Sequence, residues 1–245
     1  MAFGGTVTSR GHGQINYSGT TGDVGDTFTP AEDDIILVIV ANSSSTGSVT
    51  SMTASNWNIT FSEVTGSPWG GQAKRLGLWV GRVGASPTSD RVTANRSGMI
   101  TRSGFYIVQI SGCKTDGTPE SVLEQISSLY EAYQGGGSPI TIDTLSSFQT
   151  DSLTFCFGLY GKGGATWTTP SGYTGFIDDD TYSLSVIAVY NTAEDTTPNL
   201  EYSSLPTYEY VDAIALEIRS DSGGAGSVVP IIMSNLNQFN GGIIK

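Results

Sequence analysis

The feature of this chain that most constrains its fold is an internal repeat of alternating apolar segments. Residues 76–80 match residues 184–188, and residues 106–110 match residues 214–218, both at an offset of 108. In each match, apolar residues fall on apolar positions and polar residues on polar positions. Because side chains alternate between the two faces of a β-strand, matches that keep this alternation predict equivalent strands.

A third pair of segments precedes these two. Asp34–Val40 matches Asp151–Phe157 at an offset of 117, and both lie at an acidic turn. The second segment alternates large and small residues, which predicts one core face, whereas six consecutive apolar residues in the first predict burial on both faces. The sequence therefore predicts an all-β sandwich over residues 1–220, made of two pseudo-repeated units at about 25–112 and 138–220.

Residues 119–133, between the two copies, fit two different structures. Pro119 stands where a helix would begin, and apolar residues follow at helical spacing. The repeat and the composition, with 32 glycines and only 14% charged residues, instead favour a strand or an irregular crossing. Both interpretations stay open from the sequence alone.

Residues 221–245 form a glycine linker followed by an apolar tail. The tail is too hydrophobic to stay in water, so it either folds back on its own sandwich or binds a neighbouring subunit. In the second case the tail would be an assembly interface. The candidate interface residues are Val228, Val229, Ile231, Ile232, Met233, Leu236 and Phe239.

Residue types that perform catalysis or hold metals are scarce in this chain. His12 is the one histidine, and with Cys113 and Cys156 it cannot provide a zinc or iron–sulfur ligand set. Asp178–Asp180 lacks the ligand spacing of a calcium loop. We therefore expect no catalytic residue, no metal site and no cofactor, and we expect that the protein is not an enzyme. Two converging carboxylates of a glycosidase are the weakest alternative, and pairing of the two cysteines stays open.

The charge of the chain limits its partners. The net charge is −12, which opposes a phosphate backbone, so we expect no nucleic-acid partner. No run approaches 18 apolar residues and the start of the chain lacks a signal-peptide pattern, so we expect no membrane span and no ordinary export. The charge is uneven: residues 1–122 hold 8 basic and 9 acidic side chains, and residues 123–245 hold 3 and 14.

Tryptophans in predicted loops suggest a second kind of site. Trp57, Trp69 and Trp167 are candidates for stacking on sugar rings, and Trp69 lies in a Pro/Gly-rich insertion of the first copy. Trp57 has a near-equivalent in Tyr173 of the second copy. Equivalent placement favours a shared packing role for that pair over sugar binding.

The order of the segments resembles a known family. An acidic turn leads into an apolar strand (34–41), a Trp-containing turn (55–57), a Leu-Trp strand (76–83) and a strand ending in Ser-Gly (105–112), and a shorter copy follows. This order resembles the jelly-roll-like β-sandwich structural proteins of tailed bacteriophages, over about residues 25–220.

The resemblance implies a jelly-roll-like sandwich and a non-enzymatic structural protein of the virion, assembled in the host cytoplasm. A capsid decoration or auxiliary protein is the first expectation, and a tail or fibre component is the second. The implied partners are the major capsid protein or other virion proteins and further copies of the chain, as a homo-oligomer. The family has no catalytic residues to transfer. A glycan-binding module that uses the loop tryptophans to hold surface glycans is the separate alternative.

Overall fold

The fold is all-β, as predicted from the sequence. The computed structural model describes residues 3–15, 19–42, 48–64, 75–97, 103–133, 140–142, 145–146, 151–161, 163–180, 184–204 and 209–221, without the side chains of residues 75, 130–133 and 209. Sixteen strands and two short 3₁₀ helices lie within this part of the chain.

The strands divide into two consecutive sets of eight. The first unit contains β1 (Thr6–Gln14), β2 (Thr21–Phe28), β3 (Ile35–Asn42), β4 (Ser48–Thr53), β5 (Thr60–Glu63), β6 (Arg75–Arg82), β7 (Asp90–Ser97) and β8 (Ser103–Ser111), with η1 (Ser55–Trp57) before β5. The second unit contains β9 (Leu123–Tyr133), β10 (Ile140–Thr141), β11 (Leu153–Tyr160), β12 (Thr166–Thr168), β13 (Thr174–Asp179), β14 (Ser185–Asn191), β15 (Asn199–Ser204) and β16 (Glu209–Ile218). The helix η2 (Pro119–Val122) lies between the two units.

The two units have the same topology. In the first, a five-stranded sheet has the order β1-β8-β3-β6-β5 and a three-stranded sheet has the order β2-β7-β4. In the second, the orders are β9-β16-β11-β14-β13 and β10-β15-β12, which are the same orders with each strand number raised by eight. The predicted duplication is therefore present. Each copy begins earlier than predicted, because the first copy includes β1 and β2 and the second includes β9.

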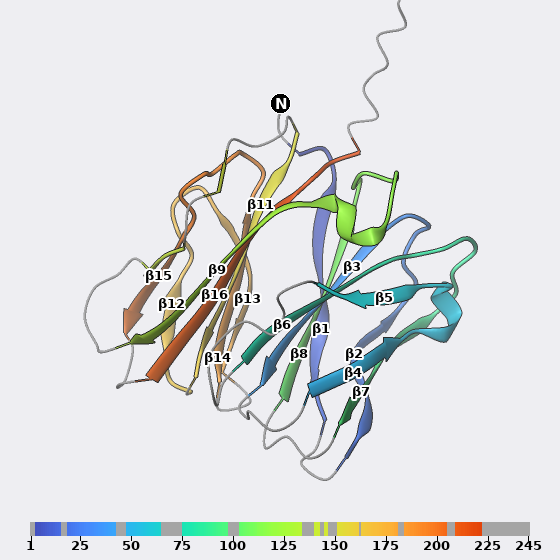
Figure 1. Cartoon of the computed structure of the whole chain (residues 1–245), viewed down its shortest axis with the longest axis horizontal. Helices are drawn as coiled ribbons and strands as arrows, with labels where there is room; N and C mark the ends of the chain where they lie inside the picture. Colours follow the sequence, from blue (N-terminus) through green and yellow to red (C-terminus); the bar gives the residue numbers. More distant parts are fainter. Residues whose placement is uncertain are drawn as a thin grey trace, which may run out of the picture.

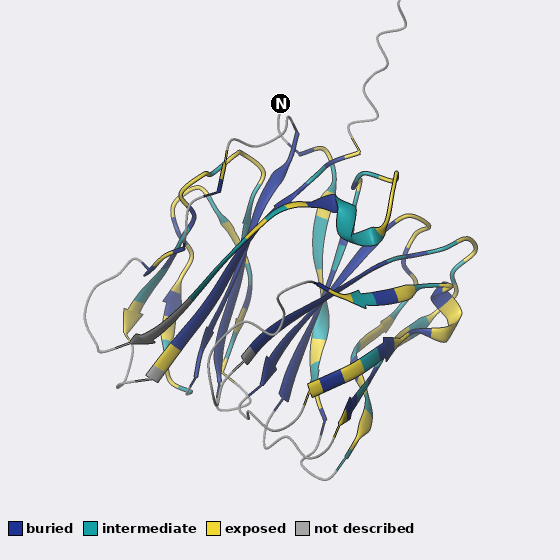
Figure 2. Ribbon diagram, in the orientation of Figure 1, coloured by how far each residue is buried: buried dark blue, intermediate teal, exposed yellow. Residues whose placement is uncertain are grey.

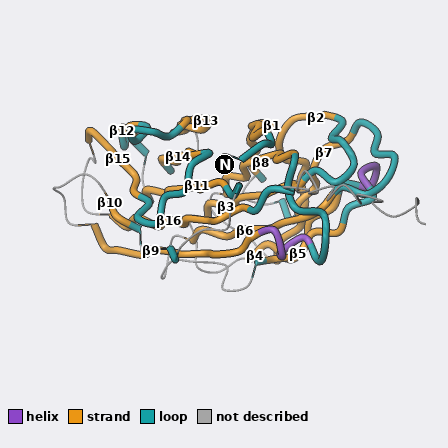
Figure 3. The backbone as a smooth tube through the Cα atoms, turned by 90° about the horizontal axis from the view of Figure 1, so that it is seen from above, coloured by secondary structure: helices purple, strands orange, loops and turns teal. Residues whose placement is uncertain are grey.

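The four sheets form four layers. From left to right in Figure 1 these are the three-stranded sheet of the second unit, its five-stranded sheet, the five-stranded sheet of the first unit and its three-stranded sheet. Figure 3 shows the two units side by side from above. The two five-stranded sheets face each other, so the chain forms two sandwiches that share a third, central interface.

Each interface between sheets is filled by an apolar core. The central core takes side chains from both five-stranded sheets, among them Leu37, Leu78, Val108, Phe155, Val186 and Leu216. The first outer core includes Val38, Trp57, Trp79, Val92 and Ile107. The second outer core includes Cys156, Trp167, Ile187, Leu200 and Ala215.

Burial on both faces explains the continuous apolar runs. All eight residues of β3 are buried, as the six apolar residues in this segment predicted. All eight residues of β11 are buried as well, so the prediction of one core face for this segment was wrong. Figure 2 shows these strands in dark blue through the middle of the molecule. The small residues of β11 do not face solvent, because they contact the second outer core.

The predicted alignment of the first repeated segment was wrong by one residue. Asp33 and Asp151 both have a φ of 67°, in the left-handed region that aspartate tolerates better than most residues. This match has an offset of 118 rather than 117. It also places Ile35 on Leu153, and both face the central core. The error arose because the first turn contains two adjacent aspartates and the second of them was aligned.

The open question about residues 119–133 is answered by η2 and β9. The helical signal at Pro119 produces one 3₁₀ turn, and the chain then extends into an eleven-residue strand that pairs with β16. The apolar residues have helical spacing but do not form a helix, because pairing with β16 satisfies the backbone N–H and C=O groups over this length.

The ends of β8 and β16 meet in a way that reveals approximate two-fold symmetry. Cys113 and Ser220 form an antiparallel bridge, and the Asp221 amide donates to the Gly112 carbonyl at 2.8 Å. At the offset of 108, Gly112 is equivalent to Ser220 and Cys113 to Asp221. Exchanging the two units therefore converts the Cys113–Ser220 pair into the Asp221–Gly112 pair. A local two-fold axis runs between these two pairs and relates the two units.

Candidate functional site

The predicted interface residues of the tail, Val228, Val229, Ile231, Ile232, Met233, Leu236 and Phe239, lie outside the described residues, and so does Trp69. The described part of the chain ends at Asp221, which is exposed and follows directly after the bridge between the two units, next to the local two-fold axis.

Trp57 is a core residue of the first unit. Its side chain is fully buried in the first outer core, and its ring centroid lies 4.6 Å from that of Phe28. Tyr173 packs partly against the second outer core. The packing role inferred from their equivalent placement is confirmed, and Trp57 is not accessible for stacking on a sugar.

Trp167, one of the predicted binding residues, lies at a pocket of the second unit. The pocket has a volume of about 240 Å³ and opens between β12 and β13, edge strands of two different sheets. Its lining residues are Trp167, Thr169, Gly175, Phe176, Ile177, Asp178 and Ile187. A β-bulge between Gly175 and Ile177 interrupts the pairing of β13 with β14, and bulges of this kind often lie next to binding sites.

The polar groups of this pocket suit an uncharged ligand. Trp167 is 5% exposed, and its indole N–H has no hydrogen-bond partner among the described residues. The pKa of Asp178 is raised by burial and by the nearby carboxylates of Asp179 and Asp180. The pocket thus has an acidic residue, Asp178, in its lining, which disfavours anions.

The rest of the acidic turn is structural. Asp179 accepts a hydrogen bond from the Tyr106 hydroxyl at 2.9 Å, which joins the two units across the central core. Asp180 accepts from the Gly164 amide at 2.8 Å and from the Ser185 hydroxyl at 2.6 Å. Within the described residues, no group of three or more His, Cys, Asp or Glu side chains is placed to hold a metal ion.

The two cysteines are not paired. Cys113 lies in the central core and Cys156 in the second outer core, and both are free thiols. Burial raises the pKa of Cys113 to about 12 and raises that of Cys156 as well. Because the thiolate is the reactive form, both side chains act as small apolar residues at neutral pH.

Asp212 is a buried acid that the sequence analysis did not single out. It lies on β16, is 1% exposed and projects from the same face as Ile214, toward the central core. Neither carboxylate oxygen has a hydrogen-bond partner of ordinary geometry in the described part of the chain. Burial raises its pKa to about 8, and the nearby Leu76 amide offsets only part of this rise. An aspartate between apolar neighbours in a strand was the available signal.

Comparisons with family models, with curated proteins and with solved structures find no match to this chain. In the part of the chain that the structure describes, no helix has the length and apolar character needed to cross a membrane. The features that bear on function are therefore the fold, the pocket beside Trp167 and the end of the described chain at Asp221.

Proposed function

We propose that this chain is a non-enzymatic structural protein of a bacteriophage particle. A capsid decoration or auxiliary role is the first candidate, with the major capsid protein and further copies of the chain as partners, and a tail or fibre role is the second. The observation that carries the proposal is a body with three apolar cores whose described part ends at exposed Asp221, with an apolar segment following in the sequence. Burial of that segment against a neighbour would stabilise an assembly by about 25 cal/mol per Å² before association costs.

The strand order supports this proposal at the level of the fold. In each unit the first strand pairs with the eighth and the second with the seventh, so that β1-β8-β3-β6 faces β2-β7-β4. We propose that each unit is a modified jelly roll, in which β5 pairs with β6 instead of β4. Jelly rolls are common in viral capsid domains, which is an analogy of fold and not of site.

Removal of residues 222–245 should abolish incorporation into particles and leave the body folded. The expected result is a circular-dichroism spectrum and a melting temperature close to those of the full chain, with loss of the protein from purified particles. Incorporation at the level of the full chain would contradict the assembly role. Mass spectrometry of particles separates the two candidates, because hundreds of copies indicate the capsid and a handful indicate the tail.

The pocket beside Trp167 favours binding of a neutral sugar as a second candidate function. Its volume of about 240 Å³ is below the range of roughly 300–1,000 Å³ for drug-sized ligands, so it suits one ring. The ring of Trp167 forms part of the wall, and Thr169 and Asp178 offer a hydroxyl and a carboxyl group to a sugar. The acidic residues at the rim would repel uronic acids.

Replacing Trp167 with phenylalanine should weaken sugar binding about fivefold, because the smaller ring removes part of the apolar wall of the pocket, worth about 1 kcal/mol. The measurement is titration with glucose, galactose and N-acetylglucosamine, followed by NMR. Trp57→Phe is the matched control, since Trp57 is buried in the other unit. Equal binding by both variants, or binding of glucuronate as tight as that of glucose, would contradict this assignment.

A further inference from the structure

The outer edge of β9 is an unprotected sheet edge. β9 is eleven residues long and pairs with β16 on one side, and within the described residues no strand pairs with its other side. From Gln125 to Tyr133 its register with β16 is unbroken. A long regular edge presents unpaired backbone N–H and C=O groups that can pair with another chain.

The equivalent edge of the first unit is protected. β1 has a register shift between Ser9 and His12, and Gly11 within this shift has a φ of 78°. Bulges of this kind twist an edge away from further pairing. β9 has its own register shift only at its start, between Leu123 and Gln125, so the two equivalent strands differ in where their pairing is interrupted.

The side chains of β9 add an apolar surface to this edge. Ile126 is 38% exposed, and with Tyr210 it is one of two large apolar side chains that are exposed in the described part of the chain. Ile126 lies opposite Leu216 and is therefore on the face of the central core. A strand added beside β9 would cover Ile126 and extend that core.

The tail contains a segment whose composition suits this edge. Residues 231–240 have no charge, no proline and no glycine, and they begin with two β-branched residues. Their length of ten residues also suits the nine-residue free ladder of β9.

The position of Asp221 favours a neighbour as the donor of this strand. Leu123, at the start of β9, pairs with Ile218, close to Asp221 in the chain. An antiparallel strand beside β9 would start at the opposite end, about 33 Å away at about 3.3 Å per residue. The ten steps from Asp221 to residue 231 span at most about 36 Å, so the same chain could place residue 231 there only with its glycine-rich linker almost fully extended, which costs conformational entropy.

We propose that the free edge of β9 binds residues 231–239 of a neighbouring copy as an added antiparallel strand. This inference rests on the proposed assembly function and names the surface and the segment that carry it. Main-chain hydrogen bonds along the edge supply the affinity, and cover of Ile126 supplies part of the selectivity.

The first test compares two full-length variants with matched exposure. Ile126→Lys places a charge on the edge and should weaken self-association by about tenfold, equivalent to about 1.4 kcal/mol. Tyr210→Lys adds the same charge on β16, which is not an edge strand, and should have little effect. Association is measured by light scattering over a dilution series. Equal effects of the two variants would overturn the assignment to β9.

The second test identifies the donor chain by crosslinking. Full-length Ser128→Cys and Ser234→Cys proteins are mixed and treated with a short bismaleimide, to which buried Cys113 and Cys156 are inaccessible. A crosslinked heterodimer is expected, whereas Ser9→Cys on β1 should give none. A crosslink within one chain that carries both Ser128→Cys and Ser234→Cys would overturn the neighbour assignment. If assembly depends on residues 222–245 but no crosslink forms at β9, this inference is wrong and the proposed function still holds.

Discussion

Replacing Asp212 with asparagine should remove a steep loss of stability between about pH 4 and pH 8. The buried carboxyl has a pKa of about 8 in the folded protein, against about 3.9 for an aspartate in an unfolded chain. Between these values the folded state holds a proton that the unfolded state releases. The free energy of unfolding therefore falls as pH rises, by up to about 1.4 kcal/mol per pH unit.

Urea denaturation at one-unit steps from pH 4 to pH 9 measures this slope. The asparagine variant should show a shallower slope than the wild type, whatever the cost of its own buried amide. Glu217→Gln is a suitable control, because Glu217 is equally buried on the same strand but accepts a hydrogen bond from Gln125 at 2.6 Å. An unchanged slope in the Asp212 variant would show that another group causes the pH dependence.

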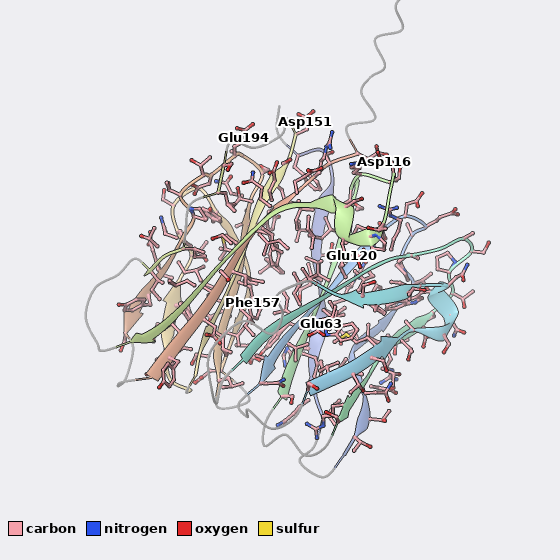
Figure 4. All side chains as sticks on the ribbon, in the orientation of Figure 1. Glu63, Asp116, Glu120, Asp151, Phe157 and Glu194 are labelled. Atoms are coloured by element: carbon pink, nitrogen blue, oxygen red, sulfur yellow. The ribbon has the colours of Figure 1, made fainter. Side chains whose placement is uncertain are left out.

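Replacing Phe157 with alanine should destabilise both units together, by about 3–5 kcal/mol. Phe157 is fully buried on β11 of the second unit, and its ring centroid lies 5.7 Å from that of Tyr106 in the first. Figure 4 labels this side chain in the middle of the molecule. Because the central core is shared, a cavity there weakens the attachment of each unit to the other as well as the second unit itself.

The measurement is thermal unfolding followed by tryptophan fluorescence in a background with Trp69→Phe and Trp167→Phe, where the remaining Trp57 and Trp79 report on the first outer core. The variant should shift this signal and the far-UV circular dichroism to the same lower temperature. Phe61→Ala, which alters only the first outer core, is the comparison. If the midpoint of the fluorescence transition is unchanged while that of the circular-dichroism transition falls, the two units unfold separately. The prediction that they are destabilised together would then be wrong.

The strands that contain the repeat could be predicted from sequence because their alternation is strong. The segments of β3, β6, β8, β11, β14 and β16 were all expected as strands, and these six form the centres of the two five-stranded sheets. What the pattern could not reveal is how many layers there are. The apolar run of β3 predicted burial on both faces, but the alternation in β11 predicted one buried face, so the covering of both five-stranded sheets on two sides stayed hidden.

The candidate site was predictable only in part. Trp167 was selected as an exposed stacking residue, and the structure instead buries it at a pocket where only its N–H lacks a partner. Asp212 was missed because burial of a charge depends on which sheet covers it, and that is a long-range property. The free edge of β9 was hidden for a related reason, since edge position follows from topology and not from the residues of the strand.

The bridge between Gly112–Cys113 and Ser220–Asp221 has a consequence for how this chain can change over generations. In a dimer of identical chains, every substitution appears on both sides of the axis. Here the two halves occupy equivalent places but are encoded separately, so each can acquire mutations that the other lacks. The 14 acidic residues after residue 122, against 9 before it, and the different positions of the register shifts, at the start of β9 and within β1, are differences that a symmetric pair could not maintain.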